Sequence, residues 1–437
     1  MKPSSCIAGD EPEHSRRSPE LAAYIGPPIH HNFSWLLMGN GAFSLAQWAQ
    51  IAVLAKLSSP ALIGEYALAM ALVNPVFMFT NLDLSVVQAT DARHRYAFSD
   101  FVMLRLLSSS MALLMVVALV FSLHSGRTIH ALALVRILGL AADSLCNIFG
   151  GLQQKHERMD RVAISLLLRA FLSVALFTVI FQHTHSIVTA SAALPVVSTL
   201  ILLCWDFPMA RQVLQNAPLL AWDSQRLRSL ALFSLPLGVI VTLISLYVNI
   251  PRYALMRYAG SAELGIFASL SYVVMAVTLI VNGLTQSVSP RLARLYASGD
   301  VYRFRSLMLR LCAIGSLLGL GSLAFASLFG RPLLAIIYRP EYAAHVNVLL
   351  VMAATTGIGA VASFLGCGIT AAHYFRYQVW TMLGAVLTSA LASLLMVPRY
   401  HAMGAALALL LSTLVRMGIA SAILRRALRH QEQGPAS

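Results

Sequence analysis

Twelve apolar runs, each long enough to cross a bilayer as a helix, dominate this sequence. A transmembrane helix needs about 20 consecutive apolar residues, and backbone surrounded by lipid must form its hydrogen bonds internally. With 58% hydrophobic and 11% charged residues, the chain lies far outside the composition of soluble enzymes, disordered proteins and nucleic-acid-binding domains. The sequence predicts an all-α polytopic membrane protein with spans at about 33–56, 61–82, 101–123, 129–150, 162–182, 186–207, 230–252, 263–285, 304–329, 343–370, 374–398 and 401–424.

The basic residues predict the orientation of these spans. The formal net charge is +14; on a soluble protein this would suggest nucleic acid, but here most basic residues lie in short loops. If the N-terminus is cytoplasmic, 20 basic residues fall on the inner side, 7 on the outer side and 4 within spans. Cytoplasmic loops collect Lys and Arg, so we expect both termini in the cytoplasm. Any remaining basic excess suits an anionic substrate rather than nucleic acid.

An internal repeat predicts two equivalent lobes. A shift of 201 residues aligns the second predicted span with the eighth. The aligned pairs include Gly64 and Gly265, Asn81 and Asn282, and Arg93 and Arg294. Because the shift covers an even number of spans, the repeats are parallel and related by an axis along the membrane normal, as in some secondary transporters. The expected parts are a cytoplasmic tail (1–32), an N-lobe (33–207), a cytoplasmic linker (208–229), a C-lobe (230–425) and a second cytoplasmic tail (426–437).

Several sequence runs resemble one transporter family. They are GEYALAMALVNPVFMFTNLDL in the second span, NIPRYALMRYAGSAELGIFASLSYVV and LTQSVSPRLARLYASGD around the eighth, and RPEYAAHVNVLLVMA after the ninth. In order and spacing they are similar to the polysaccharide-export flippases of the multidrug/oligosaccharidyl-lipid/polysaccharide superfamily. The likeness extends over residues 33–425 and implies a V-shaped pair of six-helix bundles around a central cavity. It also implies transport of an undecaprenyl-pyrophosphate-linked oligosaccharide from the inner to the outer leaflet.

Charged residues within spans are the first candidates for a site, because a charge in the bilayer core costs at least about 2.5–3.5 kcal/mol without a partner. Arg136 lies inside the fourth span, and Asp143 and Asn147 follow on the same helical face. Two interpretations stay open. The three residues form a structural polar seam, or they line a cavity in which Arg136 attracts pyrophosphate and Asp143 limits its charge or takes a proton.

Three further groups of polar residues interrupt the spans. Arg169 and Arg416 lie seven or eight residues from predicted cytoplasmic ends, and a structural role and a cavity role are equally open for both. Arg105 and Arg310 lie closer to such ends, so we expect their side chains to reach the interface. The remaining candidates for gating or for an interfacial anchor are Asn249, Pro251 and Arg252 in the seventh span, and Asn74 and Asp83 with the second.

Arginine suits the oxygens of a diphosphate, so Arg136, Arg169, Arg252 and Arg416 form the predicted cationic cavity for the substrate. We find no catalytic constellation, no metal-ligand spacing among the five cysteines and no nucleotide-binding loop. The sequence therefore predicts a transporter without cofactor or metal rather than an enzyme.

The resemblance leaves alternatives for the function. The first hypothesis is a flippase for lipid-linked oligosaccharide in the bacterial inner membrane, which supplies lipopolysaccharide O-antigen, capsule or exopolysaccharide synthesis. It would act as a functional monomer in the lipid bilayer, beside polysaccharide polymerase machinery. The second is a multidrug cation antiporter of the same superfamily, which would need acidic residues in its cavity. The third is a membrane polysaccharide polymerase, which would need a longer outer loop than 330–342.

Overall fold

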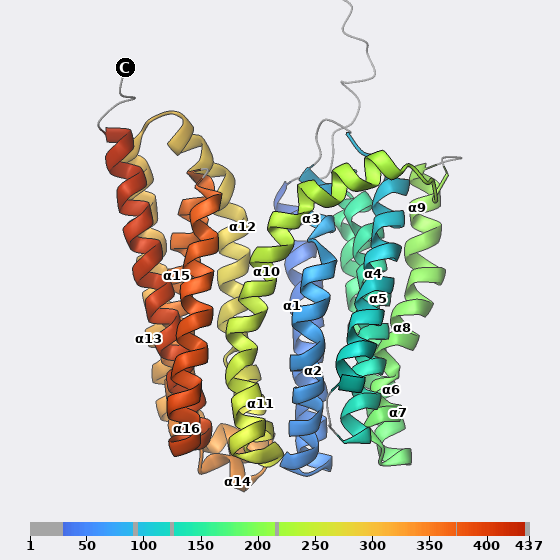
Figure 1. Cartoon of the computed structure of the whole chain (residues 1–437), viewed down its shortest axis with the longest axis vertical. Coiled ribbons are helices and arrows are strands. Elements are labelled where there is room, and N and C mark those ends of the chain that lie inside the picture. Colours follow the sequence, from blue (N-terminus) through green and yellow to red (C-terminus); the bar gives the residue numbers. More distant parts are fainter. Residues whose placement is uncertain (1–28, 91–94, 123–125, 215–217, 373, 433–437) are drawn as a thin grey trace, which may run out of the picture.

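The computed structural model describes residues 29–90, 95–122, 126–214, 218–372 and 374–432. The described residues form helices joined by short connections, with no β-strand among them (Figure 1). The predicted N-terminal tail as far as residue 28, and residues 433–437 of the predicted C-terminal tail, lie outside the described residues. The prediction of an all-α fold is confirmed.

The helices follow the predicted spans closely. The first half of the chain contains α1 (Ile29–Leu57), α2 (Pro60–Asn81), α3 (Leu84–Thr90), α4 (Phe98–Ser122), α5 (Arg127–Lys155), α6 (Met159–Thr184), α7 (Ile187–Ser191), α8 (Ala193–Ile201), the π-helix η2 (Leu202–Asp206) and α9 (Phe207–Leu214). The second half contains α10 (Ser224–Tyr258), α11 (Gly260–Val273), α12 (Met275–Ala297), α13 (Val301–Ile337), α14 (Pro340–Ala343), α15 (Val346–Ala371) and α16 (Phe375–Glu432).

Local sequence signals set several of these boundaries. The Ser59 side chain accepts a hydrogen bond from the backbone N–H of Leu62, and Pro60 occupies the first helical position of α2. Asp223 caps α10 in the same way, through the backbone N–H groups of Gln225 and Arg226. These caps satisfy backbone donors that have no partner within the helix.

By length and hydropathy, nine helical segments of the described residues qualify as membrane spans, or ten if the bent pair α11 and α12 counts as one. The sequence predicts twelve. Part of the difference lies in α16, which counts once although its backbone leaves the helical conformation at His401, with φ 49° and ψ −125°. The predicted eleventh and twelfth spans meet at this residue. Helix α1 lies where the first span is predicted but is not among the nine.

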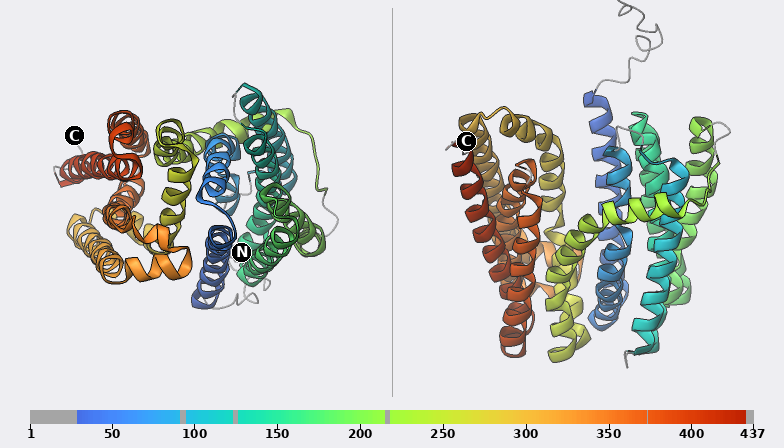
Figure 2. Two further views of the ribbon diagram at one scale, coloured as in Figure 1. Left: turned by 90° about the horizontal axis from the view of Figure 1, so that it is seen from below. Right: turned by 45° about the horizontal axis from the view of Figure 1, so that its top comes forward.

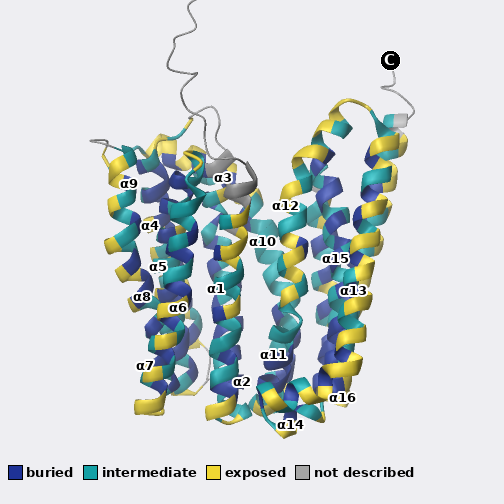
Figure 3. Ribbon diagram, turned by 180° about the vertical axis from the view of Figure 1, so that it is seen from behind, coloured by how far each residue is buried: buried dark blue, intermediate teal, exposed yellow. Residues whose placement is uncertain are grey.

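The surface of the helix bundles is apolar, as lipid requires. Leu114, Leu317 and Leu395 are 69%, 71% and 70% exposed, respectively. In water such a surface would be unfavourable, whereas hydrocarbon chains contact it at no cost. Figure 3 shows exposed residues along the outward faces of the helices and buried residues where helices pack together.

The helices form two lobes that meet at one end. Helices α1–α9 pack together as the N-lobe, and α10–α16 as the C-lobe, while α2 contacts both α10 and α11 across the boundary. A single apolar core, which includes Ile63, Phe77, Phe267 and Tyr342, joins both lobes near α14. Toward the other end each lobe has its own core. The two lobes therefore diverge in a V, as Figure 1 shows, and the resemblance predicts this shape correctly.

The start of α1 and the end of α16 lie at the open end of the V, opposite α14 (Figure 2). The open end also carries the connections between α5 and α6 and between α12 and α13. The two chain ends lie at the same end of the molecule because the chain runs its length an even number of times between them. We refer below to the open end and, around α14, to the closed end.

At the closed end, α2 and α11 cross at two glycines. A Cβ atom on Gly64 would lie 1.8 Å from the backbone oxygen of Ser261, and one on Gly265 would lie 1.9 Å from that of Pro60. Such distances are far inside van der Waals contact, so no larger residue fits this crossing without backbone movement. These are the two glycines that the internal repeat aligns. Near them, Arg339 donates a hydrogen bond of 3.0 Å to the backbone oxygen of Lys56 across the lobes.

Helix α10 belongs to both lobes. Its first turns pack on the N-lobe, where Leu227 and Leu230 share a core cluster with Leu84 and Phe101. The rest of the helix packs on α16 and α2. Pro236 lies between these two parts, and proline removes one hydrogen bond from the helix interior. The helix changes direction as it leaves the surface of the N-lobe (Figure 1).

The glycine crossing yields a prediction for stability. Gly64→Ala or Gly265→Ala places a Cβ atom against backbone, so each should lower the free energy of unfolding by about 1–3 kcal/mol, as overpacked sites do. The measurement is the thermal unfolding midpoint of the purified protein in detergent. Gly321→Ala is the matched control, because a Cβ atom there meets nothing within 4 Å. Equal midpoints for the Gly265 and Gly321 variants would contradict the tight crossing.

Candidate functional site

A small polar cavity lies at the junction of the two lobes. It has a volume of ≈ 30 Å³ and is lined by residues from both lobes. Gln47 and Gln50 come from α1, Tyr66 from α2, Arg136 from α5 and Tyr272 from α11. A second cavity of ≈ 10 Å³ shares Gln50, Tyr66 and Arg136 with it. These volumes suit one or two water molecules, so the site is nearly closed in this conformation.

Arg136 is the charged group of this cavity. Its Nε atom is buried and has no hydrogen-bond partner among the described residues. Arg136 also belongs to none of the ion pairs found between described residues. Arg136 interacts electrostatically with the phenol of Tyr66, which also interacts with Tyr272 of the other lobe. A guanidinium group that forms no hydrogen bond or ion pair with a described residue is suited to an anion, because charge-assisted hydrogen bonds are the strong ones.

A larger polar cavity continues from this site toward α12. It has a volume of ≈ 320 Å³, and Phe43 belongs to both linings. Its polar residues are amides and hydroxyls from α1 and α12: Asn40, Ser44, Asn282, Gln286 and Ser287. Such groups donate and accept hydrogen bonds without charge, as the hydroxyl groups of sugars require. Asn282 is one of the residues that the repeat aligns.

An apolar groove borders the same region. It has a volume of ≈ 270 Å³ and shares Ser44 and Leu279 with the polar cavity and Tyr272 with the cavity around Arg136. Most other residues of its lining are apolar: Leu45, Trp48, Val273, Met275, Ala276, Phe325, Leu333 and Ile337. The junction therefore brings together a buried cation, a polar chamber and an apolar groove. No acidic residue lines any of these four cavities.

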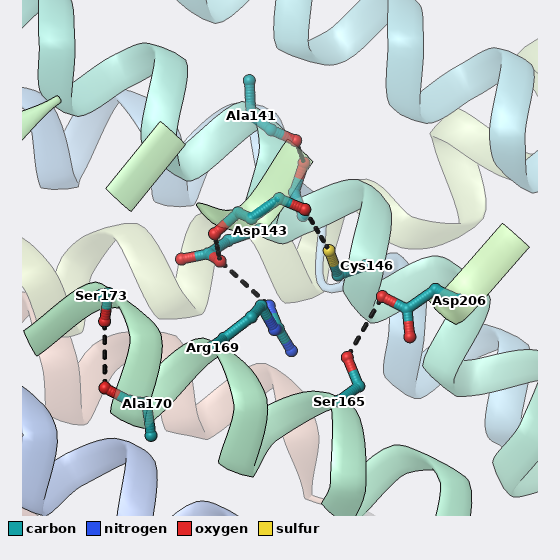
Figure 4. Close-up of polar contacts among 10 residues, drawn as sticks. Ala141, Asp143, Cys146, Ser165, Arg169, Ala170, Ser173 and Asp206 are labelled. Carbon is teal, nitrogen blue, oxygen red and sulfur yellow. Dashed lines mark hydrogen bonds and ion pairs between the residues drawn. The ribbon is translucent and has the colours of Figure 1, made fainter. Parts of the chain in front are cut away.

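Arg169 lies in the N-lobe and is paired. Its guanidinium Nη1 donates to Asp143 Oδ1 at 2.9 Å, and it lies over the ring of Phe43. The same carboxylate oxygen accepts a hydrogen bond of 2.7 Å from Ser198 of α8. Figure 4 shows this cluster, with Asp206 of η2 accepting from Ser165 at 3.1 Å nearby. The pair joins α5 to α6 inside the lobe.

The predicted face of Arg136, Asp143 and Asn147 is thus divided among three environments. Arg136 points into the junction cavity, Asp143 pairs with Arg169, and Asn147 is exposed on the surface of α5. The helical spacing is as predicted, but seven residues separate the first two groups, and their side chains have different surroundings.

Arg252 and its neighbours lie on α10 beside the N-lobe. Arg252 Nη1 donates to Asn249 Oδ1 at 3.1 Å, and Asn249 Nδ2 donates to the backbone oxygen of Ser245 at 2.8 Å. Tyr253 donates to the backbone oxygen of Ala71 in α2. Pro251 is buried within α10 and does not end the helix. This segment therefore connects the two lobes across the α2–α10 contact.

The gating candidates predicted in the N-lobe, Asn74 and Asp83, lie on α2 and just after it. Asn74 is half-buried next to the buried Pro75, which α2 accommodates in mid-helix. Asp83 has a left-handed backbone conformation with φ 49° and follows the end of α2. It interacts electrostatically with Arg105.

Arg416 is buried inside the C-lobe. It donates to Tyr247 of α10 at 3.2 Å, and to the backbone oxygen of Gly359 at 3.2 Å and Ser363 Oγ at 3.1 Å in α15. Its guanidinium also lies over the Tyr247 ring. Of the four arginines of the predicted cationic cavity, Arg136 is the one that lines the junction cavities. Arg169 and Arg416 hold helices together, and Arg252 bonds within α10.

Arg105 corrects the expectation that its side chain reaches the interface. It is 1% exposed and donates to the backbone oxygen of Asn81 at 2.9 Å and to the Asn81 side chain. The last carbonyl groups of α2 lack partners within the helix, and Arg105 of α4 supplies one. Sequence reasoning also missed Tyr66, Gln50 and Tyr272, because polar and aromatic residues in the spans are too numerous to rank without packing.

Two helical lobes that share a core at one end and enclose a polar cavity at their junction define a two-lobed membrane transporter fold. The family model described as polysaccharide biosynthesis protein matches residues 29–296. The chain therefore belongs to the polysaccharide biosynthesis protein family, and the resemblance to the polysaccharide-flippase branch of its superfamily is confirmed.

Known proteins agree with this assignment. The chain is 24% identical over 395 residues to the capsular polysaccharide biosynthesis protein CapF of Staphylococcus aureus, with 88% of this chain and 96% of CapF covered. A multidrug resistance MATE family transporter of the MOP superfamily in an inward-facing conformation matches with a TM-score of 0.65 at 14% identity, covering 95% of this chain and 98% of that one. A MOP superfamily transporter from Pyrococcus furiosus, described as having a binding pocket of reverse polarity, matches with a TM-score of 0.63 at 14% identity, covering 92% of this chain and 96% of that one.

The buried ion pair yields the second prediction. Asp143→Asn removes the charge that compensates Arg169, and breaking a buried pair from one side typically costs about 3–5 kcal/mol of stability. The thermal unfolding midpoint should fall clearly, and the double variant Asp143→Leu/Arg169→Met should recover part of the loss. Arg158→Gln is the control, because its pair with Asp160 is 39% and 34% exposed and such pairs contribute about 0–1 kcal/mol. A midpoint unchanged by Asp143→Asn would show that the pair does not support the fold.

Proposed function

We propose that this protein is a flippase that carries an undecaprenyl-pyrophosphate-linked oligosaccharide across the bacterial inner membrane for surface polysaccharide synthesis. The carrying observation is that Arg136, which forms no hydrogen bond or ion pair with a described residue, lines a junction cavity with no acidic residue in its lining. The family of the chain and the name of its S. aureus relative support a polysaccharide pathway. The pathway is O-antigen, capsule or exopolysaccharide.

The cavity around Arg136, the larger polar cavity and the apolar groove match the three parts of such a substrate. The pyrophosphate carries at least two negative charges and would bind Arg136, because the unused donor of this side chain favours an anionic ligand. The sugars would occupy the chamber lined by Asn40, Asn282 and Gln286. The prenyl chain would lie in the apolar groove at Leu45 and Phe325, on the side where α1 and α13 approach the junction.

The basic residues of the loops support an orientation with both termini in the cytoplasm. In that orientation the open end of the V faces the cytoplasm, where lipid-linked repeat units are assembled. Substrate would enter at the open end, and the lobes would then part at the crossing of α2 and α11 to release it outward. The two lobes enclose the pathway within one chain, so the proposed unit is a monomer, which would deliver its product to polysaccharide polymerase machinery.

The second candidate is a multidrug cation antiporter, favoured by the fold of the MATE transporters. An organic cation needs a carboxylate or an aromatic cage. Asp143 is engaged by Arg169 and Ser198, and the junction cavities present an arginine instead. The charge of the site therefore favours an anionic substrate.

The test combines genetics with analysis of lipids. In a host strain that lacks the gene, Arg136→Ala should reduce surface glycan and cause lipid-linked repeat units to accumulate on the cytoplasmic side. A charge-assisted hydrogen bond is worth about 1.5–3 kcal/mol, which corresponds to a loss of transport of about 10- to 100-fold. Arg136→Lys should keep part of the activity, because it keeps the charge but not the planar fork of donors.

The matched control is Arg310→Ala, which removes an exposed arginine of α13 that lines none of the junction cavities. It should complement the deletion fully at equal protein level. Accumulation of single repeat units on the outer leaflet would indicate a polymerase. Normal glycan together with higher sensitivity to cationic drugs would favour the antiporter and overturn the flippase proposal.

A further inference from the structure

A fifth cavity lies in the C-lobe, away from the junction. Its volume is ≈ 470 Å³, larger than any cavity at the junction. It lies between the start of α13 and the last turns of α16, with α15 behind them. These helix ends stand at the open end of the V, on the edge of the C-lobe far from the N-lobe (Figure 1).

Three arginines form the rim of this cavity. Arg305 comes from α13, and Arg425 and Arg429 come from α16, where a spacing of four residues places both on one face. All three are exposed. None belongs to an ion pair between described residues, and no acidic residue lines the cavity. Three guanidinium groups around one opening repel one another unless an anion lies between them.

The floor of the cavity is apolar. Apart from the arginines and Ser421, the lining consists of apolar side chains: Met308 and Leu424 are buried, Cys312, Leu365 and Leu428 are half-buried, and Leu309 is exposed. A free phosphate ion would use the rim and leave this floor empty. A molecule with a negatively charged head and an apolar tail would satisfy both parts.

We propose that this cavity binds an anionic phospholipid of the surrounding leaflet, with its phosphate on Arg305, Arg425 and Arg429 and the start of an acyl chain on Leu309 and Leu428. The position supports the proposal, because these arginines lie at the ends of spanning helices, where headgroups are found. Basic pockets between helix ends on the cytoplasmic side are a known way to hold anionic lipid. The site is separate from the transport cavity, so its test is independent of the proposed function.

Cys312 provides a direct reporter for the test. It lies in the lining of the cavity and is half-buried, whereas Cys204 is exposed on another helix and serves as an internal reference. The purified full-length protein in neutral detergent is treated with N-ethylmaleimide, and the alkylation of each cysteine is followed by mass spectrometry. Mixed micelles with phosphatidylglycerol should slow the reaction of Cys312 and leave that of Cys204 unchanged.

The arginine variants identify the headgroup site. A basic residue near a membrane surface contributes about 1 kcal/mol, so Arg305→Ala or Arg429→Ala should raise the half-protecting concentration of phosphatidylglycerol about fivefold. Arg426→Ala is the matched control, because Arg426 is equally exposed, lies beside Arg425 and is not part of the lining. In this variant, the half-protecting concentration of phosphatidylglycerol for Cys312 should equal that of the natural chain.

Three results would overturn the proposal. Equal protection by phosphatidylcholine would show that any lipid covers the cavity without use of the arginines. Protection by inorganic phosphate alone would show a phosphate site rather than a lipid site. An equal effect of Arg426→Ala and Arg429→Ala would show that net charge, and not this cavity, attracts the lipid. An unchanged rate at Cys204 in each variant confirms that the fold is intact.

Discussion

The contact between α2 and α11 at Gly64 and Gly265 determines how the two lobes are arranged. Because neither residue has a side chain, the two helices approach until backbone meets backbone, and the apolar cores of the lobes merge around this point. Tyr66 and Tyr272 follow the two glycines in sequence and close the cavity around Arg136 from opposite lobes. The same contact therefore holds one end of the molecule shut and sets the floor of the site. Farther from it, separate cores allow the lobes to diverge.

The buried arginines differ in what satisfies their charge. Arg169 has a carboxylate, Arg416 has a hydroxyl, a phenol and a carbonyl group, and Arg105 has the end of α2. Each of these contacts joins two helices, so the cost of burying the charge is offset by packing that the lobe needs. Arg136 is half-buried and lines its cavity together with tyrosine and glutamine side chains. The structure thus separates arginines that build the lobes from one whose charge is available to a ligand.

Much of the fold follows from the sequence, whereas most of the site does not. Apolar runs predict the helices because each run must satisfy its own backbone in lipid, and the repeat aligns the two glycines that prove to touch. The partner of Arg169 lies 26 residues away on a neighbouring helix, and a periodic pattern contains no information about which helices are neighbours. Arg105 lies near a predicted helix end, yet it is buried because the end of α2 packs against it. Such contacts depend on how helices are rotated about their axes, which hydropathy does not determine.

The path of α10 has a consequence for how the protein is made. In its first turns, Leu227 and Leu230 are buried against α3, α4 and α5, although the rest of the helix begins the second lobe. A chain synthesised from its N-terminus completes the first lobe before these turns emerge. The first turns of α10 then pack on the apolar surface of the folded first lobe. This contact sets the direction in which the second lobe begins. We therefore expect the lobes to assemble in sequence, with the earlier one setting the position of the later one.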